Sequence, residues 1–128
     1  WGFELTWCGV FHGKEIHINK GHRTSLKFNT HKDEVLYVQA GEIFIEFADE
    51  GHFDSPTRHP SRSLTLLPGQ LLNVQAGCPY RLSAIEDSVL FEISNSKASG
   101  SRIIIEDDYG RTENDSEAKN WIFIPPIV

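Results

Sequence analysis

The sequence predicts an all-β fold, either a sandwich or a barrel, and three observations indicate it. Short runs of strand-forming residues recur along the chain, and apolar and polar residues alternate within them. Gly, Pro and Asn separate these runs. No segment keeps the period of an amphipathic helix for more than a turn or two. At 128 residues, one domain with its own hydrophobic core is expected.

The alternation identifies the strands in order along the chain. In the run 14–19, Ile16 and Ile18 share one face and polar residues share the other. The run 34–39 is rich in strand formers and ends at a turn with Gly41, after which 42–47 alternates again. Further strands are expected at 63–67, 70–75, 88–93 and 102–106.

Two polar stretches interrupt this pattern. Residues 49–62 predict a long loop, and 107–120 are acidic and polar. The apolar residues 121–128 follow, and they would remain exposed to water unless they pack on something. We therefore expect this apolar end to dock on the rest of the chain or on a second subunit.

Charge and composition exclude several function classes. The net charge is −6 without a basic cluster, which argues against nucleic-acid binding. No apolar run approaches the roughly 20 residues that span a bilayer, so no membrane partner is expected. Cys8 and Cys78 lie outside any CxxC spacing, which favours free thiols in a reducing cytoplasm. The sequence begins at Trp1 and has no Met, so we expect that an upstream segment was trimmed, processed or not included.

The richest polar cluster lies between Gly21 and Glu34. His31 and Glu34 stand three residues apart at the entrance of a strand, and both can point into a barrel mouth. An imidazole and a carboxylate suit Zn, Fe, Mn or Ni, but two ligands alone make a poor site. The Gly- and Pro-containing region 67–82 is expected to form the opposite wall.

Several segments resemble the two motifs of the cupin superfamily: GHRTSL at 21–26, KDEVLYV at 32–38 with Gly41, and Pro68-Gly69 with GCPYR at 77–81. The most similar members are small single-domain cupins like the C-terminal part of type II mannose-6-phosphate isomerases. The resemblance covers about residues 1–111. It implies a barrel over 1–111 and a C-terminal tail, 112–128, that packs on the barrel or on a partner subunit. It implies a double-stranded β-helix, or jelly-roll barrel, and a homodimer.

Metal-binding cupins take two His and one Glu from the first motif and one His from the second. By this resemblance His31 and Glu34 match two ligands, while Asn29 and Tyr80 stand where the other His residues would be. Two accounts remain open. Either Asn29, Tyr80 or water completes a divalent metal site, or the same residues hydrogen-bond a small polar ligand without metal. The second is favoured because two strong ligands rarely retain a transition metal.

The resemblance also implies a substrate class of sugars or sugar phosphates. In an isomerase-like reaction Glu34 or His31 would act as base, Tyr80 as proton donor and Arg81 as anchor for a phosphate. His17, on the polar face of its strand, is a further candidate for ligand binding, with a surface histidine as the alternative. A non-catalytic binding or sensory module fits the sequence at least as well. A structural barrel used in assembly is a third alternative, and the apolar C-terminal tail is its only indication.

Overall fold

A computed structural model describes residues 1–7, 11–52, 54–95, 102–108 and 121–124. Over these ranges the secondary structure consists of strands joined by turns, and no helix occurs that is long and apolar enough to cross a membrane. The strands are β1 (Gly2–Trp7), β2 (Phe11–Ile18), β3 (Leu26–Asn29), β4 (Glu34–Ala40), β5 (Ile43–Phe47), β6 (Arg62–Leu66), β7 (Leu71–Val74), β8 (Tyr80–Ala84), β9 (Ser88–Asn95), β10 (Arg102–Glu106) and β11 (Trp121–Ile124).

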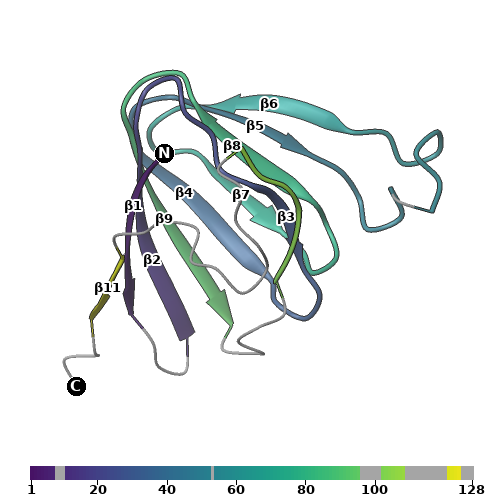
Figure 1. Cartoon of the computed structure of the whole chain (residues 1–128), viewed down its shortest axis with the longest axis horizontal. Coiled ribbons are helices and arrows are strands. Elements are labelled where there is room, and N and C mark those ends of the chain that lie inside the picture. The colour runs from purple at the N-terminus through teal and green to yellow at the C-terminus, as the bar shows by residue number, and fades with distance from the viewer. Residues whose placement is uncertain (8–10, 53, 96–101, 109–120, 125–128) are drawn as a thin grey trace.

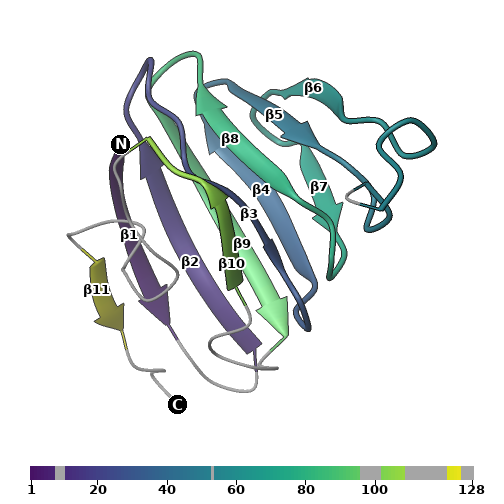
Figure 2. The ribbon, with the colours of Figure 1, turned by 45° about the vertical axis from the view of Figure 1, so that its right-hand side comes forward.

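The strands form two sheets that face each other (Figures 1 and 2). One sheet has six strands in the order β11-β1-β2-β9-β4-β7, and the other has five in the order β10-β3-β8-β5-β6. Neighbouring strands are antiparallel, except that β11 runs parallel to β1. Among the described strands only β1–β2 and β5–β6 are consecutive within one sheet, so the chain repeatedly crosses between the layers. This is the connectivity of a jelly roll.

The core lies between the inner faces of the two sheets. The expected alternation places Ile16 and Ile18 inward from β2, and Ile43 and Ile45 inward from β5. These side chains leave almost no surface in water, and their burial is the main stabilising contribution. The buried core consists of Ile16, Ile18, Leu36, Val38, Ile43, Ile45, Leu66, Val74, Tyr80, Leu82, Ala84 and Leu90.

The alternating runs were confirmed as β2, β4, β5, β6, β7, β9 and β10, whereas β1, β3, β8 and β11 were not expected as strands. β3 escapes the pattern because it presents polar Lys27 and Asn29 to the interior. β8 does not follow the pattern because Tyr80, Arg81 and Leu82 are all buried, with polar Arg81 between two core residues. Alternation identifies strands with one apolar face, and neither strand has that form.

Gly77 connects the two motif regions. Its φ of 84° lies in the left-handed region, which a glycine adopts at low cost. Its N–H donates to the Asn29 carbonyl at 2.6 Å, which ties the end of β3 to the turn before β8. A Cβ at this position would lie 3.1 Å from Glu50 Cβ, so the turn is also close-packed. This turn sets the start of β8 and therefore the direction of its side chains.

The expected loop lies between β5 and β6, and β11 of the expected tail pairs with β1 (Figure 1). Cys78 is a free, partly buried thiol, and burial raises its pKa. Cys8 and the acidic stretch from residue 109 to residue 120 lie outside the described residues.

Candidate functional site

Strand β8 separates two groups of polar side chains. Tyr80 points into the space between the sheets, and the next residue, Arg81, points to the outer face of the five-stranded sheet. The exposed fractions are only 1% for Tyr80 and 3% for Arg81. The two residues that the sequence placed side by side in one pocket therefore belong to two different sites.

The inner cluster consists of Asn29, Glu34, Tyr80 and Glu92, all of them buried. The Asn29 side-chain amide donates to Glu34 Oε1. The Tyr80 hydroxyl donates to Glu34 Oε2 at 2.8 Å and lies 3.4 Å from Glu92 Oε1. These groups satisfy one another, as buried polar groups must.

Strand register brings the two carboxyl groups together. Leu36 pairs with Glu92 across β4 and β9, and Glu34 pairs with Ser94, so Glu34 and Glu92 are diagonal neighbours on the inner face. On the opposite sheet Lys27 pairs with Tyr80. The Lys27 ammonium lies 5.5 Å from the centroid of the Tyr80 ring, in a cation–π arrangement.

The two carboxyl groups have opposite pKa shifts. Burial, followed by the charge of Glu92 and a hydrogen bond to it, raises the pKa of Glu34 to about 8. Burial acts to raise the pKa of Glu92 as well. The charge of Lys14, the hydrogen bond with Glu34 and the charge of Lys27 outweigh that effect and lower it. At neutral pH the pair therefore shares one proton, and the opposite shifts favour Glu34 as its carrier.

The donor set of the inner cluster does not fit a transition-metal centre. Asn29, Glu34 and Tyr80 meet as the resemblance implied, but His31 is exposed in the turn between β3 and β4. Within the described ranges no three His, Cys, Asp or Glu side chains are grouped so that they could hold a metal ion. A neutral carboxylic acid, a phenol and an amide that already hydrogen-bond one another are weak ligands for Zn, Fe, Mn or Ni.

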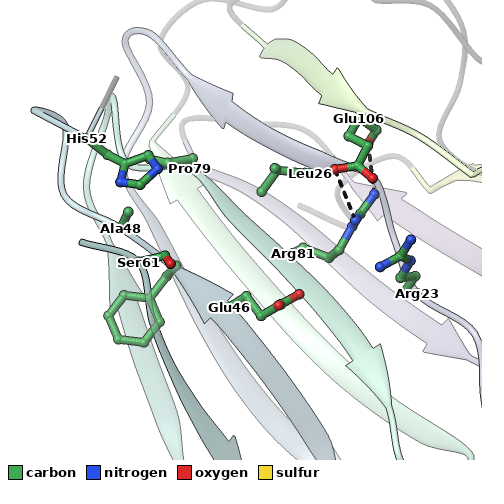
Figure 3. A pocket seen from close by; sticks show the side chains of 10 residues that line it. Arg23, Leu26, Glu46, Ala48, His52, Ser61, Pro79, Arg81 and Glu106 are labelled. Carbon is green, nitrogen blue, oxygen red and sulfur yellow. Dashed lines mark hydrogen bonds and ion pairs between the residues drawn. The ribbon is translucent and has the colours of Figure 1, made fainter. Parts of the chain in front are cut away.

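The outer cleft has a volume of about 350 Å³ and opens on the outer face of the five-stranded sheet (Figure 3). Arg23, Arg81 and Glu106 lie at one end, Glu46 reaches in from β5, and His52 and Ser61 lie at the other end. The lining residues are Arg23, Leu26, Glu46, Phe47, Ala48, His52, Ser61, Pro79, Arg81 and Glu106.

Register explains why these charges share one face. Glu46 pairs directly with Arg81 across β5 and β8, and Leu26 pairs with Glu106 across β3 and β10. Arg23 forms an isolated bridge with Ser83, which places it diagonally beside Arg81. The charged end of the cleft is therefore a row of side chains contributed by neighbouring strands.

Both guanidinium groups at this end are held in position. Arg81 Nε donates to the Thr24 carbonyl at 2.9 Å, and its Nη2 donates to the Glu106 carbonyl at 3.1 Å. Arg23 makes a bidentate contact with Asp108, at 2.5 Å from Nε and 2.8 Å from Nη2. This hydrogen bond lowers the pKa of Asp108. Fixed guanidinium groups lose little entropy on meeting a ligand.

His17 lies at neither site. It is on β2, facing outward from the six-stranded sheet, where its ring stacks on Phe3 with 4.1 Å between centroids. Its Nε2 contacts Glu15 Oε1 at 2.7 Å. Its interactions are those of a partly buried surface histidine.

The sequence reasoning missed Glu92, Lys27, Glu46, Arg23 and Glu106. Glu92 carried a usable signal, because it lies two residues after Leu90 in a predicted strand and therefore shares the inner face with it. Glu46 also lay in a predicted alternating strand, opposite in phase to Ile45. Alternation within a strand does not show which strand lies next to it in the sheet. Both sites arise from this pairing of strands.

No protein-family model matches the sequence, and no curated protein matches it. Solved structures do. Oxalate decarboxylase from Bacillus subtilis matches with 16% identity and a TM-score of 0.61, over 75% of this chain and 24% of that one. A vicilin from Solanum melongena, described with different anionic ligands in structurally similar pockets, matches with 18% identity and a TM-score of 0.60, over 74% of this chain and 26% of that one.

KdgF from Halomonas sp. matches with 14% identity and a TM-score of 0.58, over 71% of this chain and 74% of that one. The chain has the cupin jelly-roll fold. It spans about a quarter of the length of the oxalate decarboxylase and vicilin chains, and a larger share of KdgF. These likenesses concern the fold, and cupin folds serve many functions.

Proposed function

We propose that this chain is a ligand-binding module of the cupin fold that holds a small polar molecule in the outer cleft. The observation that carries the proposal is the contrast between the two sites. The inner cluster satisfies its own hydrogen bonds, whereas the outer cleft is open and places charged side chains around an accessible volume. Sugars and sugar phosphates are the first class to test.

The size and rigidity of the outer cleft support this assignment. Its volume of about 350 Å³ falls at the lower end of the roughly 300–1,000 Å³ typical of small-molecule sites. Arg81 is buried and fixed by two backbone carbonyls, so its position is set before a ligand arrives. A preorganised charged group of this kind raises affinity by lowering the cost of ordering.

Thermal unfolding with a panel of sugars and sugar phosphates tests the proposal. A compound that binds only the folded chain stabilises it by about 2.7 kcal/mol at a hundredfold excess over Kd. Ser61→Trp places an indole in the cleft and is expected to abolish the shift, whereas Thr57→Trp, on the same loop but outside the lining, is expected to retain it. An equal loss in both variants would place binding elsewhere.

Metal analysis of the purified protein tests the metal-free part of the proposal. We expect no stoichiometric Zn, Fe, Mn or Ni, because the inner cluster supplies weak ligands. One equivalent of metal that is lost in His31→Ala would contradict this, since it would bring His31 into a centre with Glu34.

A sugar-phosphate isomerase-like reaction in the inner cluster is the second candidate. Its support is the single shared proton, because Glu92 can accept a proton while Glu34 and Tyr80 can donate one. Turnover of mannose 6-phosphate, with exchange of a substrate proton for solvent deuterium, would favour this candidate. The activity should then fall at least a hundredfold in Tyr80→Phe and persist in Ser61→Trp.

A further inference from the structure

We propose that the outer cleft selects an uncharged polyhydroxylated molecule of about monosaccharide size over the phosphate ester of the same molecule. This inference rests on the function proposed above and specifies the ligand of that site. It follows from the balance of charge in the cleft, from one cross-strand pair that forms no ion pair, and from the apolar residues beside that pair.

The formal charges that line the cleft balance. The guanidinium groups of Arg23 and Arg81 face the carboxylates of Glu46 and Glu106, and Arg23 also forms an ion pair with Asp108. An added phosphate would lie close to the carboxylates of Glu46 and Glu106, and an added ammonium would lie close to two guanidinium groups. Like charges at short range disfavour both. A neutral ligand meets neither cost.

Glu46 and Arg81 provide an acceptor and a donor next to each other. They are direct partners across β5 and β8, yet the part of the chain that the structure describes shows no ion pair between them. Arg81 instead turns toward Thr24 and Glu106, which leaves the Glu46 carboxylate exposed in the cleft (Figure 3). The remaining nitrogen, Arg81 Nη1, lies 3.7 Å from Glu106 Oε2, beyond hydrogen-bond distance.

Two adjacent hydroxyl groups of a ligand complement this arrangement. One hydroxyl donates to the Glu46 carboxylate, and the other accepts from Arg81 Nη1. Each such bond involves an ionised partner and is stronger than a bond between neutral groups. An ion would pair with only one of the two residues and would oppose the other.

The apolar lining complements the carbon skeleton of the same ligand. Leu26 lies beside Arg81, and buried Pro79 directly precedes β8. A polyol ring has hydroxyl groups along its edge and C–H groups on its faces, so it can contact both kinds of lining at once. Ligand sites commonly combine such apolar contact with a few fixed polar groups.

Calorimetric titration of the wild-type chain with glucose, mannose and galactose, and with their 6-phosphates, tests the inference. At least one neutral sugar is expected to bind about tenfold or more tightly than its phosphate. Glu46→Gln removes the charged acceptor and should weaken the neutral sugar about tenfold. The matched control Glu86→Gln, at an exposed turn on the β8–β9 connection, should leave both affinities unchanged.

Each alternative result has a defined consequence. Tighter binding of the phosphate ester, strengthened further in Glu46→Gln, would overturn the inferred selectivity and leave the binding module intact. A different result would be that the chain binds an amine or an amino acid but no sugar, and that Ser61→Trp abolishes this binding. This result would overturn the ligand class alone. Sugar binding that is unchanged in both Ser61→Trp and Glu46→Gln would overturn the site and, with it, the proposed function.

Discussion

Tyr80 and Arg81 are neighbours on one strand, and both are almost completely buried, yet their surroundings differ. Tyr80 meets a closed set of hydrogen-bonding partners between the sheets. Arg81 is held by a hydrogen bond to the Thr24 carbonyl and lines an open cleft. Burial alone therefore does not distinguish a site from a core. Whether the neighbouring polar groups satisfy each other or leave an accessible group does distinguish them.

The largest effect that separates the two regions is expected for Glu92→Gln. Glu92 is the ionised group of the inner cluster, and the charges of Lys14 and Lys27 act on it. Its removal leaves buried positive charge less compensated, which typically costs about 3–5 kcal/mol of unfolding free energy. Denaturant midpoints measure this loss. The outer-face control Glu46→Gln should change stability by less than about 0.5 kcal/mol, and equal losses would contradict the distinction.

Tyr80→Phe is expected to have the next largest effect. It removes the hydroxyl that donates to Glu34 and lies near Glu92, and it should lower the unfolding free energy by about 1–3 kcal/mol. The control is Tyr37→Phe, which makes the same change on the exposed face of β4 and should cost less than about 0.5 kcal/mol. Ligand affinity at the outer cleft should be the same in Tyr80→Phe. A parallel loss of affinity would show that the two sites are coupled.

The inner cluster should also make stability depend on pH. The pKa of Glu34 is raised from 4.5 to about 8 in the folded chain. The contribution of protonated Glu34 to the free energy of unfolding is therefore complete below the pKa of the unfolded chain, and it is lost as pH rises toward the pKa of the folded chain. Glu34→Gln removes this titration. The stability of the variant relative to wild type should therefore increase by about 1.4 kcal/mol per pH unit within that window. Urea midpoints measured from about pH 5 to about pH 8 test this, and a constant difference would contradict the raised pKa.

The smallest effect is expected for His31→Ala. His31 is exposed in a turn and should contribute less than about 0.5 kcal/mol to stability. Asn29→Ala, which removes a buried donor to Glu34, is the comparison and should cost about 1–3 kcal/mol. Chemical denaturation of both variants measures the difference. A loss in His31→Ala as large as that in Asn29→Ala would place the imidazole in the inner cluster.

The amino-acid sequence by itself determined the all-β class, the jelly-roll fold and the strands in which an apolar face alternates with a polar one. It also singled out Asn29, Glu34 and Tyr80, which do come together, because motif spacing reflects the backbone path of the fold. Local alternation was sufficient for the all-β class and the strands, because burial of one face makes every second residue apolar. The jelly roll and the grouping of Asn29, Glu34 and Tyr80 came from the resemblance to the cupin motifs.

Only the tertiary structure decided which side chains share a site. The contact of Glu92 with Tyr80 depends on β9 pairing with β4 opposite β8, and the juxtaposition of Glu46 and Arg81 depends on β5 pairing with β8. Residues far apart in the chain become neighbours through strand pairing, and a shift of one residue in register reverses every side chain of a strand. Tyr80 and Arg81 point to opposite faces because they are successive residues of one strand, but strand pairing decides which partners each of them meets there.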